Sequence, residues 1–380
     1  MNAQYIKDHL PSSPAFVIDK SAIEQTLLCL KRLRQQSGCK VLYSIKALPF
    51  STVLQTVQLA VDGFSVSSLF EARLANEIAA PGQTLHLTTP GLRPDEFDEI
   101  SALCSHISFN SLSQFQRFSE SATHPFSTGL RVNPKCSLLN DERYDPCRMH
   151  SKLGVDIDAL ITSEMFAQIQ GLHWHNMFSA TDFAPLTQTV KQLRRKLGGK
   201  LASLNWLNLG GGYLYGQIKD HQSFIDLVAQ LISDFDIEVF IEPGKALVGH
   251  AGFLVATIID CFRSDGKIIA VLDTSINHHP ELFEFQRTAE LHEHTPGASY
   301  PVILAGCTCL AGDLFGEYRL TAPVKVGDKV LFKQVGAYSL IKAHRFNGYN
   351  LPDIYCYQAD LLTRLKHYDY QNYRQQWLAD

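Results

Sequence analysis

Residues 41 to 48 read V-L-Y-S-I-K-A-L, a run of strand-forming residues that closes on Lys46 between small and apolar neighbours. A lysine is ordinarily a solvated surface charge, and this one has no acidic partner near it in the sequence. From this run to Glu242, short β-rich segments alternate with longer amphipathic segments. That alternation is typical of repeated βα units around a parallel sheet.

Eight units can be counted, and they predict an α/β fold, a (β/α)8 TIM barrel, over residues 22–248. The expected strands are 40–46, 63–67, 84–88, 106–110, 128–133, 170–175, 205–209 and 238–242. The helical stretches between them are long enough to cross back over the sheet, and they span 52–60, 69–79, 94–104, 112–120, 161–168, 186–197 and 223–234.

Beyond Gly249 the chain changes to β-branched and aromatic runs separated by short turns. This texture predicts a mainly antiparallel β domain, which we assign to residues 1–21 and 249–380. Residues 15–19 are expected to add an edge strand. The other expected strands are 253–261, 267–273, 302–304, 329–334 and 353–357.

Composition limits the class of partner. The chain has 34 Lys and Arg against 38 Asp and Glu and no long basic run, which favours a small molecule over nucleic acid or an anionic membrane. The longest apolar stretch, 246–261, is broken by His250 and falls short of the roughly 20 residues of a spanning helix, so no membrane segment is expected. Nine scattered cysteines and a polar start without an export signal predict a cytoplasmic protein.

In a TIM barrel the chemistry lies at the C-terminal ends of the strands, which converge on one mouth. The polar and glycine residues expected at these ends are Lys46, Ser65, Ser68, Thr88, Thr89, Asn110, Arg131, His175, Gly210, Gly211, Gly212 and Glu242.

Two of these features have a binding interpretation and a structural alternative. The glycine run at 210–212 and the E-P-G-K turn at 242–245 offer backbone N–H groups to a phosphate, or they simply turn the chain. Glu242 could bind a protonated ring nitrogen, or it could pair with Arg131 or a lysine.

His173 and His175 lie two apart on an expected strand and therefore share one face. They could ligate a metal, or one imidazole could lie flat against a planar cofactor while His173 is structural. We favour stacking, because the other strand ends do not show the further histidine and carboxylate ligands of a metal site. Covalently bound pyridoxal 5'-phosphate requires a lysine amine, a phosphate-binding loop, a carboxylate for its ring nitrogen and a planar side chain that stacks on its ring. The sequence places candidates for all four at one mouth of the barrel.

The chain resembles the fold type III, alanine racemase-like pyridoxal-phosphate decarboxylases, which include ornithine, arginine and diaminopimelate decarboxylases. The motifs that carry the resemblance run along nearly the whole chain: Y-S-I-K-A (43–47), G-F-S-V-S-S-x-x-E (63–71), L-R-V-N-P (130–134), S-K-L-G (151–154), G-L-H-W-H (171–175), L-G-G-G-Y (209–213), E-P-G-K (242–245), G-C-T-C-L-A-G-D (306–313) and V-G-A-Y-S (335–339).

This resemblance implies that Lys46 binds the cofactor covalently, that His175 stacks on its ring and that Glu242 pairs with its ring nitrogen. It implies that Cys309 is the proton donor of the reaction. The residues it implies for the phosphate are Gly212, Gly244, Lys245 and Tyr338, and Gly211 is also expected to bind the cofactor. It also implies an obligate homodimer, in which the β domain supplies Cys309 and Tyr338 across a head-to-tail interface.

Four differences from the usual ornithine and diaminopimelate decarboxylase motifs indicate which branch of the family the chain resembles. Ornithine and diaminopimelate decarboxylases usually have Asp where this chain has Ser65, and Arg where it has Lys245. They usually have an acidic residue in place of Leu310, and H-x-G-S in place of H-N-M-F (175–178). These departures are similar to the carboxynorspermidine/carboxyspermidine decarboxylase branch of polyamine biosynthesis. So are T-T-P-G-L-R-P-D (88–95), C-L-A-G-D (309–313), L-D-T-S (272–275) and H-H-P-E-L-F-E (278–284).

The branch implies a substrate with an amino-acid head, a secondary ammonium and a primary ammonium. Carboxylates are expected to bind such a tail, and the candidates are Asp273, Glu281, Glu284 and Asp313. The E-L-F-E segment could equally be a solvated helix face. His278 could contact the substrate carboxylate or cap a loop.

Three other interpretations stay open. Diaminopimelate decarboxylase predicts an acidic residue after Cys309, and Leu310 argues against it. A non-catalytic pyridoxal-phosphate carrier would be a barrel without the β domain. A metal-dependent barrel hydrolase would use His173 and His175. The choice between carboxynorspermidine and carboxyspermidine is also open, because their tails differ by one methylene, typically worth about 1 to 3 kcal/mol in a pocket.

Overall fold

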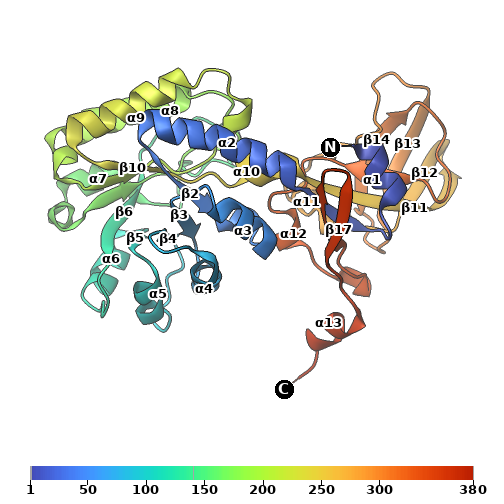
Figure 1. The fold of residues 1–380 in the computed structure, drawn as a ribbon, viewed down its shortest axis with the longest axis horizontal. Coiled ribbons are helices and arrows are strands. Elements are labelled where there is room, and N and C mark those ends of the chain that lie inside the picture. The colour runs from blue at the N-terminus through green and yellow to red at the C-terminus, as the bar shows by residue number, and fades with distance from the viewer. Residues whose placement is uncertain (1, 140, 380) are drawn as a thin grey trace. The chain divides into compact units, whose positions relative to one another are not determined.

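The computed structural model describes residues 2–139 and 141–379 (Figure 1). The chain forms two compact units. One is Glu24–Leu247, here called the barrel unit. The other combines the described residues up to Ile23 with those from Val248 onward, and is called the sheet unit.

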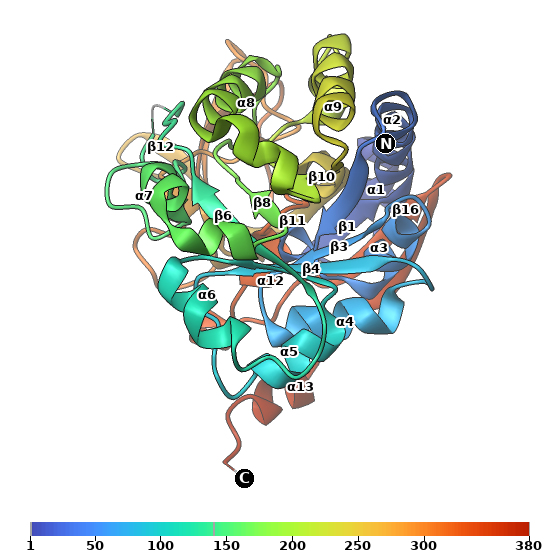
Figure 2. The same cartoon turned by 90° about the vertical axis from the view of Figure 1, so that its left-hand side faces the viewer.

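The barrel unit contains a closed barrel of eight parallel strands, which confirms the predicted TIM barrel. They follow the order β5-β4-β3-β2-β10-β9-β8-β6, and β6 pairs back with β5 to close the ring. Figure 2 shows the helices arranged around these strands. The strands are β2 (Lys40–Ser44), β3 (Gly63–Val66), β4 (Thr84–Thr89), β5 (His106–Phe109), β6 (Ser127–Asn133), β8 (Gly171–His173), β9 (Trp206–Asn208) and β10 (Glu238–Ile241), with a short β7 (Val155–Asp156) beside β6.

Helices α4, α6 and α7 begin where a short polar side chain satisfies a free amide of the first turn. Ser68 accepts a hydrogen bond from the Glu71 amide, and Glu71 in turn accepts from the Ser67 amide at 2.7 Å. Ser111 accepts from Gln114 in the same way. The helices up to the end of the barrel are α2 (Lys20–Ser37), α3 (Ser51–Gln58), α4 (Leu69–Ile78), α5 (Phe97–Leu103), α6 (Leu112–Ser119), α7 (Ile157–Thr162), α8 (Ala184–Leu197), α9 (Gln222–Phe235) and α10 (Lys245–Val248).

Trp206 packs inside the barrel beside two glycines. A Cβ at Gly171 would lie 2.0 Å from the Trp206 ring, and a Cβ at Gly129 would lie 2.3 Å from it, so only glycine fits at either position. The buried Leu42 and Phe240 complete this cluster. Because Trp206 and Gly171 are the first residues of their strands, the cluster leaves the polar residues at the C-terminal strand ends.

The sheet unit is mostly antiparallel, as predicted, with parallel pairing only of β1 with β16 and of β12 with β13 among its described strands. The strand order is β14-β13-β12-β11-β1-β16-β17, and β15 pairs with β11. The strands are β1 (Ala15–Asp19), β11 (Gly252–Ser264), β12 (Lys267–Leu272), β13 (Tyr300–Ala305), β14 (Leu314–Leu320), β15 (Lys329–Phe332), β16 (Asp353–Gln358) and β17 (Leu361–Lys366), and the helices are α1 (Ala3–His9), α11 (Glu281–Phe285), α12 (Ser339–Lys342) and α13 (Tyr370–Gln375).

The expectation that residues 15–19 form an edge strand is wrong. β1 is hydrogen-bonded on both sides, to β11 and to β16, and all five of its residues are buried. A strand buried on both faces reads as a continuous apolar run, as A-F-V-I-D does, and this pattern indicated an interior position.

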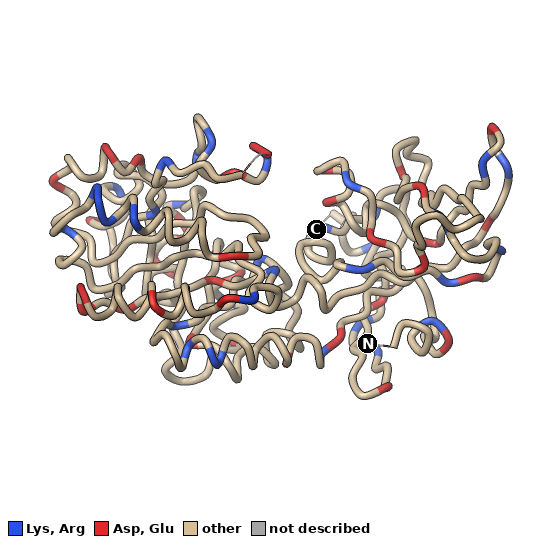
Figure 3. The backbone as a smooth tube through the Cα atoms, turned by 90° about the horizontal axis from the view of Figure 1, so that it is seen from above, with Lys and Arg blue, Asp and Glu red and all other residues tan. Residues whose placement is uncertain are grey.

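Basic and acidic residues are interspersed along the backbone (Figure 3). No helix within the described residues is both long enough and apolar enough to cross a membrane.

Candidate active site

Lys46 lies just beyond the first barrel strand. β2 ends at Ser44, two residues earlier than predicted, and Lys46 is the middle residue of a 3-10 turn, Ile45–Ala47. Ile45 and Ala47 are buried, whereas the Lys46 side chain is exposed. Desolvation by the surrounding barrel lowers the pKa of the Lys46 amine, against the opposing effect of Glu242. A lowered pKa increases the fraction of uncharged, nucleophilic amine.

Glu242 directly follows β10 and is buried, with two partners inside the barrel. Asn208 Nδ2 donates to its Oε1 at 2.8 Å, and His173 Nε2 lies 3.3 Å from its Oε2. Burial alone would raise the pKa of Glu242, but His173, Lys46 and Asn208 outweigh it and hold the pKa below its ordinary value. Glu242 is therefore an ionised carboxylate in the floor of the mouth.

Arg131 does not pair with Glu242 in the described structure. Its Nη2 donates instead to the backbone carbonyl of His175 at 3.5 Å, and no ion pair within 4.0 Å joins it to the carboxylate. The alternative in which Glu242 is simply the partner of Arg131 is therefore not what the structure shows.

His175 lies in the loop after β8, because that strand ends at His173 and not at 175 as predicted. The backbone amide of Gly211 donates to its Nδ1 at 3.0 Å, which places the proton of the neutral ring on Nε2. Desolvation and the nearby Lys46 hold the pKa of His175 well below its usual range. His175 is thus a neutral imidazole with a fixed tautomer. Among the described residues, no three histidine, cysteine, aspartate or glutamate side chains gather as metal ligands.

The glycine run after β9 makes close backbone contacts. Gly210 and Gly212 have φ of 68° and 97°, in the left-handed region that favours glycine. A Cβ at Gly211 would lie 2.3 Å from the Glu242 carbonyl oxygen. Within the described chain, the amides of Gly212 and Gly244 donate to no protein acceptor, so both are available to an anion.

The E-P-G-K turn packs against the turn that carries Lys46. The Ser44 amide donates to the Pro243 carbonyl at 3.0 Å, and a Cβ at Gly244 would lie 3.1 Å from Ser44 Cβ. The Lys245 ammonium lies 4.6 Å from the centre of the Phe178 ring. The turn that carries Gly244 and Lys245 is therefore in direct contact with the turn that carries Lys46.

Gly212→Ala is expected to destabilise the barrel. Its Cβ would lie 2.2 Å from the Met177 carbonyl oxygen, and its φ of 97° disfavours any side chain. We expect a loss of roughly 2 kcal/mol or more in the free energy of unfolding, measured by thermal denaturation. Gly199→Ala is the matched control, since a Cβ there meets nothing within 4 Å. Equal melting temperatures for the two variants would contradict the prediction.

Asn208 is the residue of this site that the sequence analysis missed. Its amide group donates to Glu242, and its Oδ1 accepts from the Gly210 amide at 2.9 Å, so it connects the carboxylate to the glycine run. The available signal was its position: Asn208 is the polar residue that ends the otherwise apolar strand W-L-N.

The candidates in the sheet unit differ in their surroundings. Cys309 is exposed, and its Sγ donates to Asn347 Oδ1 at 2.9 Å. Tyr338 precedes α12 with φ of 63°, and burial raises its pKa to about 12. His278 is buried, with Nδ1 2.9 Å from Thr274 Oγ1, and its Nε2 has no hydrogen-bond partner among the residues that the structure describes.

The four predicted carboxylates each have partners of their own. Asp273 accepts from the Thr257 amide and the Ser13 hydroxyl, and Asp313 accepts from the amides of Ile276 and Thr308. Glu281 and Glu284 on α11 face Lys342, at 3.7 and 2.7 Å. Asp273 and Asp313 therefore hold backbone segments, while the two glutamates are engaged by a side-chain ammonium.

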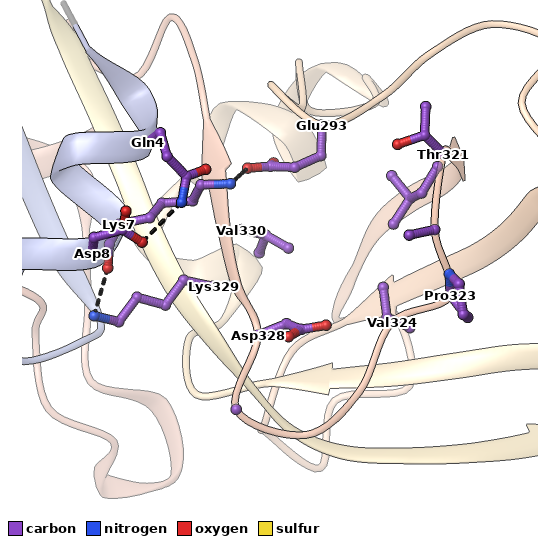
Figure 4. Close-up of a pocket in the computed structure, with 13 residues that line it drawn as sticks. Gln4, Lys7, Asp8, Glu293, Thr321, Pro323, Val324, Asp328, Lys329 and Val330 are labelled. Atoms are coloured by element: carbon purple, nitrogen blue, oxygen red, sulfur yellow. Dashed lines mark hydrogen bonds and ion pairs between the residues drawn. The ribbon is translucent and has the colours of Figure 1, made fainter.

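A separate pocket of about 530 Å³ lies in the sheet unit (Figure 4). Lys7 pairs with Glu293 at 2.8 Å, and Lys329 donates to the carbonyls of Lys7 and Leu10. None of the candidate residues above lines this pocket. Its charged groups mainly join α1 to the neighbouring strands.

A family model described as pyridoxal-dependent decarboxylase, C-terminal sheet domain, matches residues 15–336. The chain belongs to the pyridoxal-dependent decarboxylases. It is 33% identical to the carboxynorspermidine/carboxyspermidine decarboxylase of Herminiimonas arsenicoxydans, over 95% of this chain and 98% of that protein. It is 32% identical to the carboxyaminopropylagmatine decarboxylase of Synechocystis, over 95% and 94%.

Among solved structures, the carboxynorspermidine decarboxylase of Campylobacter jejuni, complexed with norspermidine, is similar to this decarboxylase. The TM-score is 0.87 at 28% identity, with 96% of this chain and all of that chain covered. The family uses pyridoxal 5'-phosphate. The observed residues fit this group: two glycine amides without acceptors suit its phosphate, and the ionised Glu242 suits its ring nitrogen.

Proposed function

We propose that this decarboxylase acts on carboxynorspermidine or carboxyspermidine and releases CO2 together with norspermidine or spermidine. The observation that carries the proposal is the similarity over nearly the whole chain to an enzyme of that name, supported by the norspermidine-bound neighbour. The departures at Ser65, Lys245 and Leu310 point the same way.

Within the barrel unit, we propose that the Lys46 amine binds the cofactor covalently and that the substrate amine replaces it. Bound pyridoxal 5'-phosphate supplies the electron sink that decarboxylation needs. Glu242 would keep a proton on the ring nitrogen, and its low pKa and the Asn208 hydrogen bond support this role. His175, held by Gly211, would lie against the ring as a neutral imidazole.

For the phosphate we propose backbone amides as the main ligands. The amides of Gly212 and Gly244, which have no acceptor within the described residues, support this, and Gly211 contributes by holding the His175 ring through its own amide. Lys245 would add a cation. We propose Tyr338 as a further phosphate ligand, contributed from a sheet unit.

For the proton that replaces CO2 we propose the thiol of Cys309. It is exposed, and its S–H is already oriented by a hydrogen bond. For the substrate tail the geometry favours Glu281, with Glu284 beside it, because a substrate ammonium can replace that of Lys342. Asp273 and Asp313 are less suited, because they already bind backbone amides. His278 Nε2 remains available to a substrate oxygen.

The test is CO2 release from purified enzyme supplied in parallel with carboxynorspermidine, carboxyspermidine, carboxyaminopropylagmatine, diaminopimelate and ornithine. We expect kcat/KM for the first two to exceed that for diaminopimelate and ornithine by at least about 100-fold, because only the first two carry a polyamine tail whose ammonium groups can bind the site's carboxylates. Release from diaminopimelate alone would contradict the proposal. Cofactor binding without any turnover would instead support a carrier protein.

We propose that the enzyme is a homodimer in which the sheet unit of one copy supplies Cys309 and Tyr338 to the barrel of the other. Mixing inactive Lys46→Ala with inactive Cys309→Ala then regains activity, because a mixed dimer has one intact site. Random exchange makes half of the dimers mixed, so about a quarter of wild-type activity is expected. No recovery after verified subunit exchange would contradict shared sites.

We also propose a cytoplasmic location. All nine cysteines are free thiols in the structure, and reduced thiols are typical of that compartment. Fractionation of the source cells with an antibody to the chain tests this.

A further inference from the structure

Cys309 has a well-defined partner 38 residues further along the chain. Its Sγ donates to Asn347 Oδ1 at 2.9 Å, and its own backbone amide donates to the same oxygen at 3.0 Å. The amide donor fixes the orientation of the Asn347 side chain, since only the oxygen can accept. The thiol proton therefore lies on sulfur and points to Oδ1.

Asp313, and not Asn347, holds the residues just before Cys309. Asp313 accepts from the Thr308 amide at 3.1 Å and from its hydroxyl at 2.5 Å, and the Gly306 amide donates to the Asp313 carbonyl at 2.7 Å. The same network continues past Cys309, since the Leu310 amide donates to Thr308 Oγ1 at 3.4 Å and the Asp313 amide donates to the Leu310 carbonyl at 2.9 Å. At Cys309 itself, Asn347 is the residue that binds both the backbone amide and the thiol.

The two neighbouring cysteines differ in a way that singles out Cys309. Burial raises the pKa of the Cys307 thiol to about 11, and this thiol is hydrogen-bonded to Tyr349. Cys309 is exposed and bonded to an amide oxygen. The segment 347–349 therefore contacts both thiols, and that of Cys309 is the more exposed of the two.

The backbone at Asn347 explains part of the choice of residue. Its φ of 58° and ψ of 14° lie in the left-handed region, which glycine and asparagine tolerate best. The next residue, Gly348, also has a positive φ of 76°. Glycine would satisfy the backbone at 347 but offers no acceptor, so the asparagine side chain is accounted for by Cys309.

We propose that Asn347 is a positioning residue that holds the Cys309 thiol proton ready for delivery. The inference rests on the proposed role of Cys309 as proton donor. Rotation about the Cβ–Sγ bond turns the proton from Oδ1 to the carbon that has lost CO2. The S–H bond breaks with its electron pair left on sulfur, a C–H bond forms, and solvent returns a proton to the thiolate.

Infrared spectroscopy tests the hydrogen bond without any turnover. Subtracting the spectrum of Cys309→Ala isolates the S–H stretching band of Cys309 from those of the other thiols. Asn347→Gly removes the acceptor without adding backbone strain, and it is expected to shift the band to higher frequency. Asn347→Asp keeps an acceptor, and Asn350→Ala is the matched control; both should leave a hydrogen-bonded band. An unmoved band in Asn347→Gly would overturn the proposal.

Kinetic measurements test whether Asn347 affects proton delivery by Cys309. We expect Asn347→Gly to lower kcat about 10- to 100-fold with KM nearly unchanged, and Asn347→Asp to recover most of that loss. In D2O the wild-type product should carry deuterium in one configuration, whereas the Asn347→Gly product should be a mixture, because solvent protonates either face. Equal losses in the glycine and aspartate variants would overturn the proposal.

Cys309→Ala distinguishes a failure of Cys309 as proton donor from a failure of Asn347 as its positioning residue. Wild-type turnover in Cys309→Ala would overturn the proposed donor and this role with it. An inactive Cys309→Ala together with an unmoved S–H band in Asn347→Gly would overturn the role of Asn347 alone.

Discussion

Lys46→Ala is expected to abolish the visible absorption of the bound cofactor and to lower the rate of decarboxylation by at least about 1,000-fold. The side chain is exposed in the mouth of the barrel, and desolvation lowers its pKa, so its amine is both accessible and nucleophilic. No other lysine stands on the turn after β2 to replace it. Absorbance spectra and CO2 release measure the two effects.

Lys40→Ala is the matched control for this prediction. Lys40 begins the same strand, at the opposite end from the mouth, and its ammonium pairs with Glu238. Exposed ion pairs contribute about 0 to 1 kcal/mol, so this variant should keep cofactor and activity. A colourless protein that retains zinc, or a Lys46→Ala variant that keeps its absorption band, would contradict the covalent role.

Glu242→Gln is expected to lower kcat by roughly 100- to 1,000-fold while the protein stays folded. Glutamine has nearly the same volume but no charge, so it cannot keep a ring nitrogen protonated. Its Oε1 can still accept from Asn208, and its NH2 can donate to His173 Nε2 if the imidazole proton moves to Nδ1. The barrel packing is therefore preserved, and the lost charge accounts for the effect.

The matched control is Glu238→Gln, the same substitution at the start of β10, where the side chain is exposed and pairs with Lys40. We expect kcat close to wild type. Both variants are compared at saturating cofactor, so that a change in cofactor affinity is measured separately. Similar rates for Glu242→Gln and the wild type would show that the ring nitrogen needs no anionic partner.

The pKa of Glu242 adds a condition on pH. Because the folded-state pKa of Glu242 lies below the ordinary value, Glu242 loses its charge only at a pH below the pKa of an ordinary glutamate. Its contribution to stability is present above the unfolded pKa and disappears as the pH falls through the folded one. Asn208→Ala removes a hydrogen bond that lowers this pKa, so the acid limb of its activity profile should move to higher pH than in the wild type.

The barrel was predictable because each of its strands can be recognised from a short run of neighbouring residues. Each strand of a barrel is buried on both faces and reads as a short apolar run, and a polar residue or glycine after it marks the mouth. Lys46, His175 and Glu242 each follow such a run, so their common location follows from counting strands. The same argument missed β14 and β17, because both carry several exposed or charged residues.

The sequence by itself determined the class of fold, the family and the residues at the mouth of the barrel, since these depend on runs and motifs of neighbouring residues. The tertiary structure alone decided that β1 is an interior strand, that Asn208 holds Glu242, that Asp313 binds backbone amides and that Asn347 holds Cys309. Each of these is a hydrogen bond or strand pairing between residues far apart in the chain. Such contacts depend on distance and direction in space, which no local pattern of residue types specifies.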